Sequence, residues 1–416
     1  MQLRRAAALI ALGTVSVALP SLARADVVQL DTAHTLYTEA PFRTNMTVYT
    51  PSVDLRASPW EALDVRGGWS ADVVSGASVS TKAGPAYQGT HPAADVVSTA
   101  SVKDLRNVGH GGLTIKKEAV ALDVNYAYST ENDYKSHTVD AAARTDLFEH
   151  NTQLEIAYAH NFDRVCDRVQ GANDAPSRFR PLESSTGCFA SNDPLRTTRG
   201  ISIDGFQGTW SQAWTPIFAT QLVYSTQITN GFQSSPYRAI ILGEGLKAQE
   251  HHPENRAREG LALRANLFLR PIRTAVRVGT RGYWDTWDVK SITADVEVEK
   301  YFGESLRLQA RGRFYRQSGA LFWSDDYTGG DRPLGPKGQY FTGDRELSPF
   351  TSLLIGLRAT YVIRPSEGRL LGLMQSLKLS ASADAMQFDY DEYTLGGSTI
   401  SNARAFIFGL NASAVF

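Results

Sequence analysis

The sequence lacks the features of a helical membrane protein and those of a nucleic-acid-binding protein. Its one long apolar run, residues 6–19, is shorter than the roughly 20 residues that a membrane-spanning helix requires. The formal net charge of −1 provides no excess of basic side chains for a nucleic-acid partner. There is no linker, no long helical periodicity and no charged tail, so we expect a single domain.

The clearest feature that the sequence does contain is the alternation of residues 403–416. The apolar set of this segment, which includes Phe408, Leu410 and Phe416, lies on one face of a strand because strand side chains alternate with a period of two. A final strand with apolar residues outward suits a closed barrel in lipid. The ending also resembles the terminal signal by which outer-membrane proteins are recognised for assembly, and this resemblance assigns Phe408, Leu410 and Phe416 to that signal.

The N-terminal segment predicts export. Arg4 and Arg5 form a basic region, residues 6–19 form the apolar region, and Ala23 and Ala25 occupy the two positions that a signal peptidase reads. We expect a signal peptide over residues 1–25 and a mature outer-membrane β-barrel over residues 26–416. Secretion and barrel-assembly machinery are therefore expected partners.

Segments of about ten residues repeat the two-residue alternation along the chain. Strands are expected at residues 63–73, 120–129, 138–148, 153–162, 200–211, 217–229, 260–269, 275–285, 291–301, 306–315, 351–363 and 377–388. Counting from residue 46 gives about fifteen strands, and because bacterial single-chain barrels have an even number, we infer another around residues 29–39. The predicted fold is all-β, a transmembrane antiparallel up-and-down β-barrel of about 16 strands, with about 14 to 18 acceptable.

Short and long connections alternate between the expected strands. Long polar segments at residues 75–100, 163–199, 231–256, 317–346 and 389–402 are expected to be extracellular loops, and the short turns periplasmic. Trp60, Trp210, Trp214, Trp284, Trp287 and Tyr361 fall near the strand ends. We interpret these aromatic residues as a girdle at the level of the lipid headgroups.

The chain has two cysteines, Cys166 and Cys188, in one long polar segment. An exported protein meets an oxidising compartment, and neither a C-x-x-C spacing nor a nearby histidine suggests a metal or redox pair. We predict a disulfide that closes a loop of about 20 residues and stabilises the fold by roughly 3 kcal/mol.

Three successive expected strands carry charges of alternating sign on one face. Their opposite faces are apolar, so the charges must face the barrel interior, because an arginine on the lipid side at mid-membrane costs roughly 2–4 kcal/mol. This lumen charge ladder consists of Arg277 and Arg281, then Asp295, Glu297 and Glu299, then Arg307, Arg311 and Arg313. Opposite charges on neighbouring strands can pair. The sequence is compatible with a self-neutralised wall, which we favour, or with a selectivity filter.

Several short motifs, in their order along nearly the whole mature chain, resemble an uncharacterised outer-membrane β-barrel family that carries only a domain-of-unknown-function label. The motifs are Ser75-Gly76-Ala77-Ser78, Glu131-Asn132-Asp133-Tyr134, Ser235-Pro236-Tyr237-Arg238, Pro253-Glu254-Asn255-Arg256-Ala257-Arg258, Tyr283-Trp284-Asp285-Thr286-Trp287 and Arg313-Phe314-Tyr315-Arg316-Gln317-Ser318. The resemblance implies a barrel of a Gram-negative bacterium and supplies no catalytic residue.

Motifs of catalysis and metal binding are missing. There is no nucleophile elbow, zinc spacing or phosphate loop, so we interpret His110 and His160 as wall or interfacial residues and expect no enzyme, no cofactor and no metal. The densest metal-like cluster, Glu250, His251, His252 and Glu254, is interpreted as a solvated loop because adjacent residues of an extended chain point in opposite directions.

The function favoured by the sequence is a passive, porin-like channel for small solutes, since about 16 strands enclose a lumen wide enough for water. The alternative is a closed structural or scaffold barrel that binds a surface partner through its outer loops. A barrel enzyme that hydrolyses or deacylates lipids is a third, less favoured alternative. No plug domain is expected ahead of the first strand, which argues against an energised transporter. Outer-membrane lipid and lipopolysaccharide are the expected surroundings.

Overall fold

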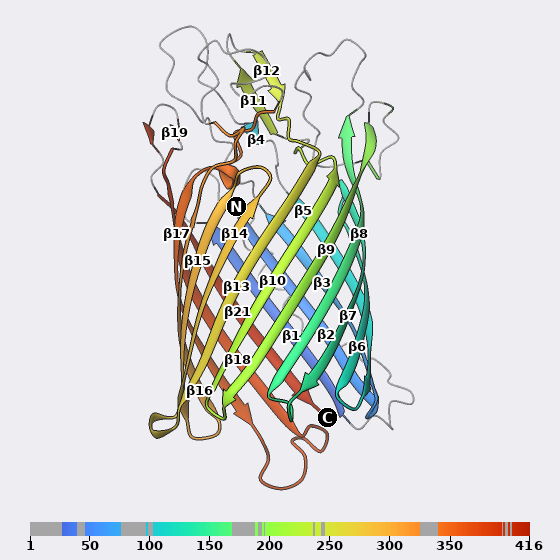
Figure 1. Cartoon of the computed structure of the whole chain (residues 1–416), viewed down its shortest axis with the longest axis vertical. Helices are drawn as coiled ribbons and strands as arrows, with labels where there is room; N and C mark the ends of the chain where they lie inside the picture. The colour runs from blue at the N-terminus through green and yellow to red at the C-terminus, as the bar shows by residue number, and fades with distance from the viewer. Residues whose placement is uncertain are drawn as a thin grey trace, which may run out of the picture.

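A computed structural model of the chain describes residues 27–39, 46–75, 97–98, 103–168, 188–189, 194, 196–235, 238–242, 246–324, 340–392, 394–395, 398–399 and 402–416. The signal peptide expected over residues 1–25 lies outside these residues. The described chain forms a closed antiparallel barrel of 16 strands (Figure 1). The sequence prediction of the fold class and of the strand number is confirmed.

Each barrel strand pairs with its neighbours in chain order, and β1 closes the barrel against β21. The barrel strands are β1 (Val27–Glu39), β2 (Thr47–Trp60), β3 (Leu63–Ser75), β5 (Lys103–Lys117), β6 (Val120–Thr130), β7 (Tyr134–Leu147), β8 (Thr152–Arg168), β9 (Arg196–Thr215), β10 (Phe218–Gly231), β13 (Asn255–Leu269), β14 (Thr274–Asp285), β15 (Lys290–Phe302), β16 (Leu306–Gln317), β17 (Phe350–Ile363), β18 (Ser376–Tyr390) and β21 (Asn402–Val415). Most strands extend a few residues beyond the segments expected from the alternation.

Short elements complete the described chain. They are β4 (Val97–Ser98), β11 (Arg238–Leu242) and β12 (Leu246–Gln249), which form one small sheet, β19 (Thr394–Leu395) paired with β20 (Ser398–Thr399), and the 3-10 turns η2 (Arg270–Ile272) and η3 (Arg345–Leu347). Within the described ranges, no helix is long and apolar enough to cross a membrane.

The two ends of the barrel differ. One end, here called the turn end, carries the tight connections such as residues 118–119 and 303–305, together with the C-terminus (Figure 1). The opposite end, here called the loop end, carries the small sheet of β4, β11 and β12 (Figure 1).

The outer face of the wall is apolar. Ile355 and Leu357 of β17 are 62% and 65% exposed, and Leu410 of β21 is 62% exposed, although all three are large aliphatic residues. The residues between them in the strands, such as Gly356, face the lumen and contact charged side chains. A barrel wall with this alternation is stable with lipid outside and water inside.

Glycines on the inner face let polar side chains meet across an intervening strand. Arg311 of β16 and Asp384 of β18 form two hydrogen bonds of 2.7 and 2.6 Å over Gly356 of β17, which is in register with both. In the same way His110 and Asp54 meet over Gly68, with a 2.9 Å contact, and Arg66 and Asn125 meet over Gly112, at 2.8 Å from Nε. These contacts tie together three strands at a time.

Replacing Gly356 by alanine should separate one of these pairs. A Cβ atom there would lie 1.7 Å from Asp384 Oδ1 and 3.0 Å from Arg311 Nε, and the Asp384 carboxylate is almost fully buried. Breaking a buried charged contact of this kind should destabilise the barrel by roughly 1–3 kcal/mol, measured as a lower melting temperature. Gly282→Ala is the matched control because nothing lies within 4 Å of its Cβ position. Equal melting temperatures of the two variants would contradict the expectation.

The predicted disulfide joins Cys166, near the loop end of β8, to Cys188. The two Cα atoms are 5.3 Å apart and Cys166 is fully buried. The bridge therefore ties the connection that follows β8 to the barrel wall.

The predicted aromatic girdle is wrong for one residue. Trp60, Trp284 and Tyr361 are 65%, 41% and 51% exposed and lie near strand ends. Trp287 is only 4% exposed and packs with Val289, Ala320, Phe322 and Leu347. The turn after β14 directs this ring inward, which the distance from a strand end could not indicate.

Candidate functional site

The residues of the lumen charge ladder lie on three consecutive strands, β14, β15 and β16. In the register of these strands Arg277 is opposite Glu297, Glu297 is opposite Arg311, and Asp295 is opposite Arg313. Several of them, including Arg277, Asp295 and Glu297, line one cavity together with residues of β10 and β13, so their side chains face the lumen.

Some of the ladder residues form ion pairs with each other. Arg277 lies 2.8 Å from Glu299 and 3.6 Å from Glu297, and Arg313 Nε lies 2.5 Å from Asp295 Oδ1. These contacts neutralise part of the wall between β14 and β16.

The other three arginines of the ladder behave differently. Arg311 pairs with Asp384 of β18 rather than with Glu297 opposite, and Arg307 lies over the ring of Tyr301 at 5.0 Å. Arg281 has no ion-pair partner among the described residues. The charge ladder is therefore only partly self-neutralised, and this could not be read from the alternation because Asp384 lies two strands away from Arg311.

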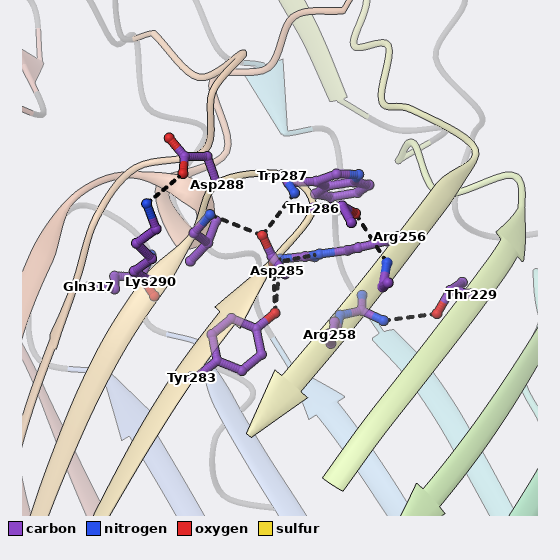
Figure 2. Close-up of polar contacts among 12 residues, drawn as sticks. Thr229, Arg256, Arg258, Tyr283, Asp285, Thr286, Trp287, Asp288, Lys290 and Gln317 are labelled. Atoms are coloured by element: carbon purple, nitrogen blue, oxygen red, sulfur yellow. Dashed lines mark hydrogen bonds and ion pairs between the residues drawn. The ribbon is translucent and has the colours of Figure 1, made fainter. Parts of the chain in front are cut away.

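Nearer the loop end, the carboxylate of Asp285 organises a cluster that was not singled out as a site. Arg256 donates to it from Nε at 2.8 Å, the Tyr283 hydroxyl donates at 2.6 Å, and the backbone N–H groups of Trp287 and Val289 donate at 2.9 Å each (Figure 2). The Asp285 side chain is fully buried. Such a carboxylate fixes the turn after β14 because each of its donors would be left unsatisfied without it.

The cluster also orients two arginines. The guanidinium of Arg256 stacks on the ring of Trp287 with 4.0 Å between its Cζ atom and the ring centroid. Arg258, the next inward residue of β13, donates instead to the Thr229 hydroxyl of β10 at 2.9 Å (Figure 2). Arg256 and Arg258 belong to one of the motifs that carry the family resemblance, and Tyr283, Asp285 and Trp287 belong to another. The two motifs were the sequence signal for these residues, but their meeting in space could not be read from the sequence.

Two cavities follow one another along this wall. The one nearer the loop end has a volume of about 730 Å³ and includes Tyr283 and Arg281 of β14 in its lining. The second, about 590 Å³, includes Gly279 and Arg277, the next inward positions of the same strand. Both linings are rich in arginine, acidic and amide side chains, so the space is one that water can fill.

Residues 340–349, the segment before β17, extend over the lumen at the loop end of the barrel. Arg345 donates to Glu39 of β1 at 2.9 Å, although β18 and β21 lie between β17 and β1. Burial alone lowers the pKa of the Arg345 guanidinium, but Tyr390 and the Glu39 carboxylate outweigh burial and hold this pKa above its ordinary value. The ion pair therefore remains charged and attaches the segment to β1, three strands away around the barrel.

The interpretation of residues 250–254 as a solvated loop is wrong for the side chains of Glu250 and His252. Glu250 is 2% exposed and His252 is 5% exposed. Glu250 accepts hydrogen bonds from Ser235 N at 2.7 Å and from the Thr342 hydroxyl at 2.8 Å, while His252 packs against Trp287 and Phe322. The neighbouring connections supply this burial, which the alternation of a single segment does not reveal. Among the described residues no group of three or more potential ligands could hold a metal ion.

His160 lies on the outer face of the barrel, where a lipid-modifying enzyme would need its catalytic residues. Its Nδ1 atom is 2.7 Å from Asp204, which also accepts a 2.7 Å hydrogen bond from the Tyr158 hydroxyl. Among the side-chain contacts of the described chain, no serine hydroxyl reaches this histidine. The arrangement provides an acid and a base but no nucleophile.

Comparisons with known proteins identify the family and give no activity. A family model described as "Protein of unknown function (DUF3570)" matches residues 2–368. No curated protein matches the chain.

Among solved structures, the chain is similar to a bacterial polysaccharide outer membrane secretin, with 8% identity, a TM-score of 0.46, and coverage of 94% of this chain and 98% of that one. It is also similar to Pseudomonas aeruginosa OccK2 (8% identity, TM-score 0.42, coverage 94% and 98%). A BenF-like porin from Pseudomonas fluorescens Pf-5 gives 10% identity, a TM-score of 0.41, and coverage of 93% and 99%. Likenesses of this degree carry no argument about function.

Proposed function

This chain belongs to the family described as protein of unknown function (DUF3570), and because that description names no activity, we propose one from the barrel itself: a passive outer-membrane channel for small solutes. The observation that carries the proposal is the pair of successive cavities, about 730 and 590 Å³, along a charged and polar inner wall. Barrels of 16 to 18 strands are wide enough to leave an aqueous channel.

The proposed location in the outer membrane is supported by the outer wall and by the form of the barrel. The apolar outer wall requires lipid, and closed barrels with short turns at one end and longer loops at the other are the form that strands take in outer membranes. In this proposal a signal peptide over residues 1–25 exports the chain, the turn end faces the periplasm, and the loop end faces outward. Outer-membrane lipid and lipopolysaccharide then surround the exposed aliphatic residues.

Purified barrel reconstituted in a planar lipid bilayer should give discrete conductance steps in potassium chloride. Protein denatured by heat before reconstitution is the control, since it lacks the lumen. An absence of steps at high load of heat-modifiable, folded protein would contradict the channel.

One observation favours the alternative of a closed scaffold barrel. The contact between Arg345 and Glu39 brings the segment before β17 across the loop end, and buried Trp287, Phe322 and Leu347 form an apolar core beside it. If the segment before β17 seals the lumen, the folded wild-type protein would not conduct ions. The Arg345→Ala variant, which loses the contact with Glu39, would conduct. The same recordings therefore separate the two functions.

A further inference from the structure

The cavity nearer the loop end contains two arginines that form no ion pair with a described carboxylate. Arg258 and Arg281 both line it, and neither has an ion-pair partner among the described residues. Two neighbouring arginines do form ion pairs. Arg256 is paired with Asp285, and Arg277, which lines the cavity farther from the loop end, is paired with Glu297 and Glu299. Arg258 and Arg281 thus face the lumen without a direct ion pair, in a cavity whose acidic lining residues are Asp344 and Glu346.

Arg258 and Arg281 occupy neighbouring strands and line the same cavity. Arg281 of β14 is in register with Ala262 of β13, but its side chain turns towards the loop end and lies over Gly260. A Cβ atom at Gly260 would lie 3.1 Å from Arg281 Nη2 and 3.3 Å from Nε, so a larger residue would have to shift the guanidinium by a few tenths of an ångström. Gly260 is only two residues from Arg258, which corresponds to about 7 Å along a strand.

The rest of the lining determines which anion would fit. Gln227, Thr229 and Gln317 provide neutral hydrogen-bonding groups, and Tyr283 and Tyr315 provide aromatic rings. A guanidinium binds a carboxylate through two parallel hydrogen bonds, while aromatic rings pack against an apolar or cyclic body. A cavity of about 730 Å³ has the size of sites that enclose small organic molecules.

We infer that Arg258 and Arg281 form a binding site for small organic carboxylates in the outer part of the lumen. This inference rests on the proposed channel function, since it names the class of solute that the channel favours. The carboxylate neutralises the two guanidinium groups, and the organic body lies against the rings of Tyr283 and Tyr315. A neutral solute of the same shape gains only the contacts with the rings.

Benzoate and benzyl alcohol test the inference because they share a ring and differ in the carboxylate. Benzoate should reduce the single-channel current of the wild type in a saturable manner, and benzyl alcohol should not. The double variant Arg258→Gln/Arg281→Gln should bind benzoate roughly tenfold or more weakly, the loss expected for charge-assisted hydrogen bonds. Arg264→Gln is the matched control for the single variant Arg258→Gln: each removes one positive charge from β13, but Arg264 lines the lower cavity.

The outcomes of this test separate the site from the channel. If the wild type conducts but benzoate and benzyl alcohol act alike, or if Arg264→Gln weakens binding as much as the double variant, the carboxylate site is overturned and the channel stands. If the barrel does not conduct, equilibrium dialysis of labelled benzoate against the folded protein in detergent gives the same comparison of variants. Should the double variant fail to fold, each single variant must weaken benzoate binding severalfold for the inference to hold.

Discussion

Deletion of Phe416 is expected to reduce the amount of folded barrel to a small fraction of the wild-type level. The terminal strand β21 pairs with both β18 and β1 and thereby closes the barrel. Phe416 itself donates from its backbone N–H to the Val28 carbonyl at 2.8 Å and accepts from the Gln375 side chain at 3.1 Å. The deletion removes contacts at the closing seam together with the last residue of the segment that resembles an assembly signal.

Heat-modifiable migration on a gel measures the folded fraction of this variant. Phe314→Ala is the matched control, since Phe314 is another outward-facing aromatic residue, 41% exposed, on a strand away from the seam. The control should fold in nearly normal amounts. Equal amounts of folded barrel from the truncated chain and the wild type would show that neither the seam contacts nor the signal depends on Phe416.

Neutralising Asp295, Glu297 and Glu299 together to their amides is expected to lower the melting temperature by several degrees and to shift ion preference towards anions. The substitutions leave Arg277 and Arg313 without their present partners. Breaking charged pairs while keeping one partner costs more than removing both, because the remaining charge is left unpaired. The same change adds positive charge to a lumen that already contains Arg258 and Arg281.

Thermal melting and the reversal potential in a salt gradient measure the two effects. The control variant Glu149→Gln/Glu304→Gln/Glu367→Gln removes the same charge from exposed residues of the turn end. A lower melting temperature alone would indicate a wall that is paired but does not line an open pore. Unchanged stability together with unchanged selectivity would mean that these carboxylates serve neither role.

The sequence by itself determined the architecture, because the two-residue alternation is a local property of each strand. It indicated which face of β15 carries Asp295 and Glu297. The even strand number of bacterial single-chain barrels led to the expectation of β1, whose own alternation is weak. The sequence also indicated the disulfide, since only two cysteines were available. No knowledge of distant contacts was needed for any of these conclusions.

Only the tertiary structure decided which side chains meet. The pairing of Arg311 with Asp384 depends on a glycine in the strand between them, and the burial of His252 depends on Trp287 and Phe322 from other connections. Arg258 lies opposite Asp285 in register, yet the ion pair of Asp285 is formed with Arg256. Closing the barrel brings together residues far apart in the chain, and alternation along one strand carries no information about what lies across the lumen.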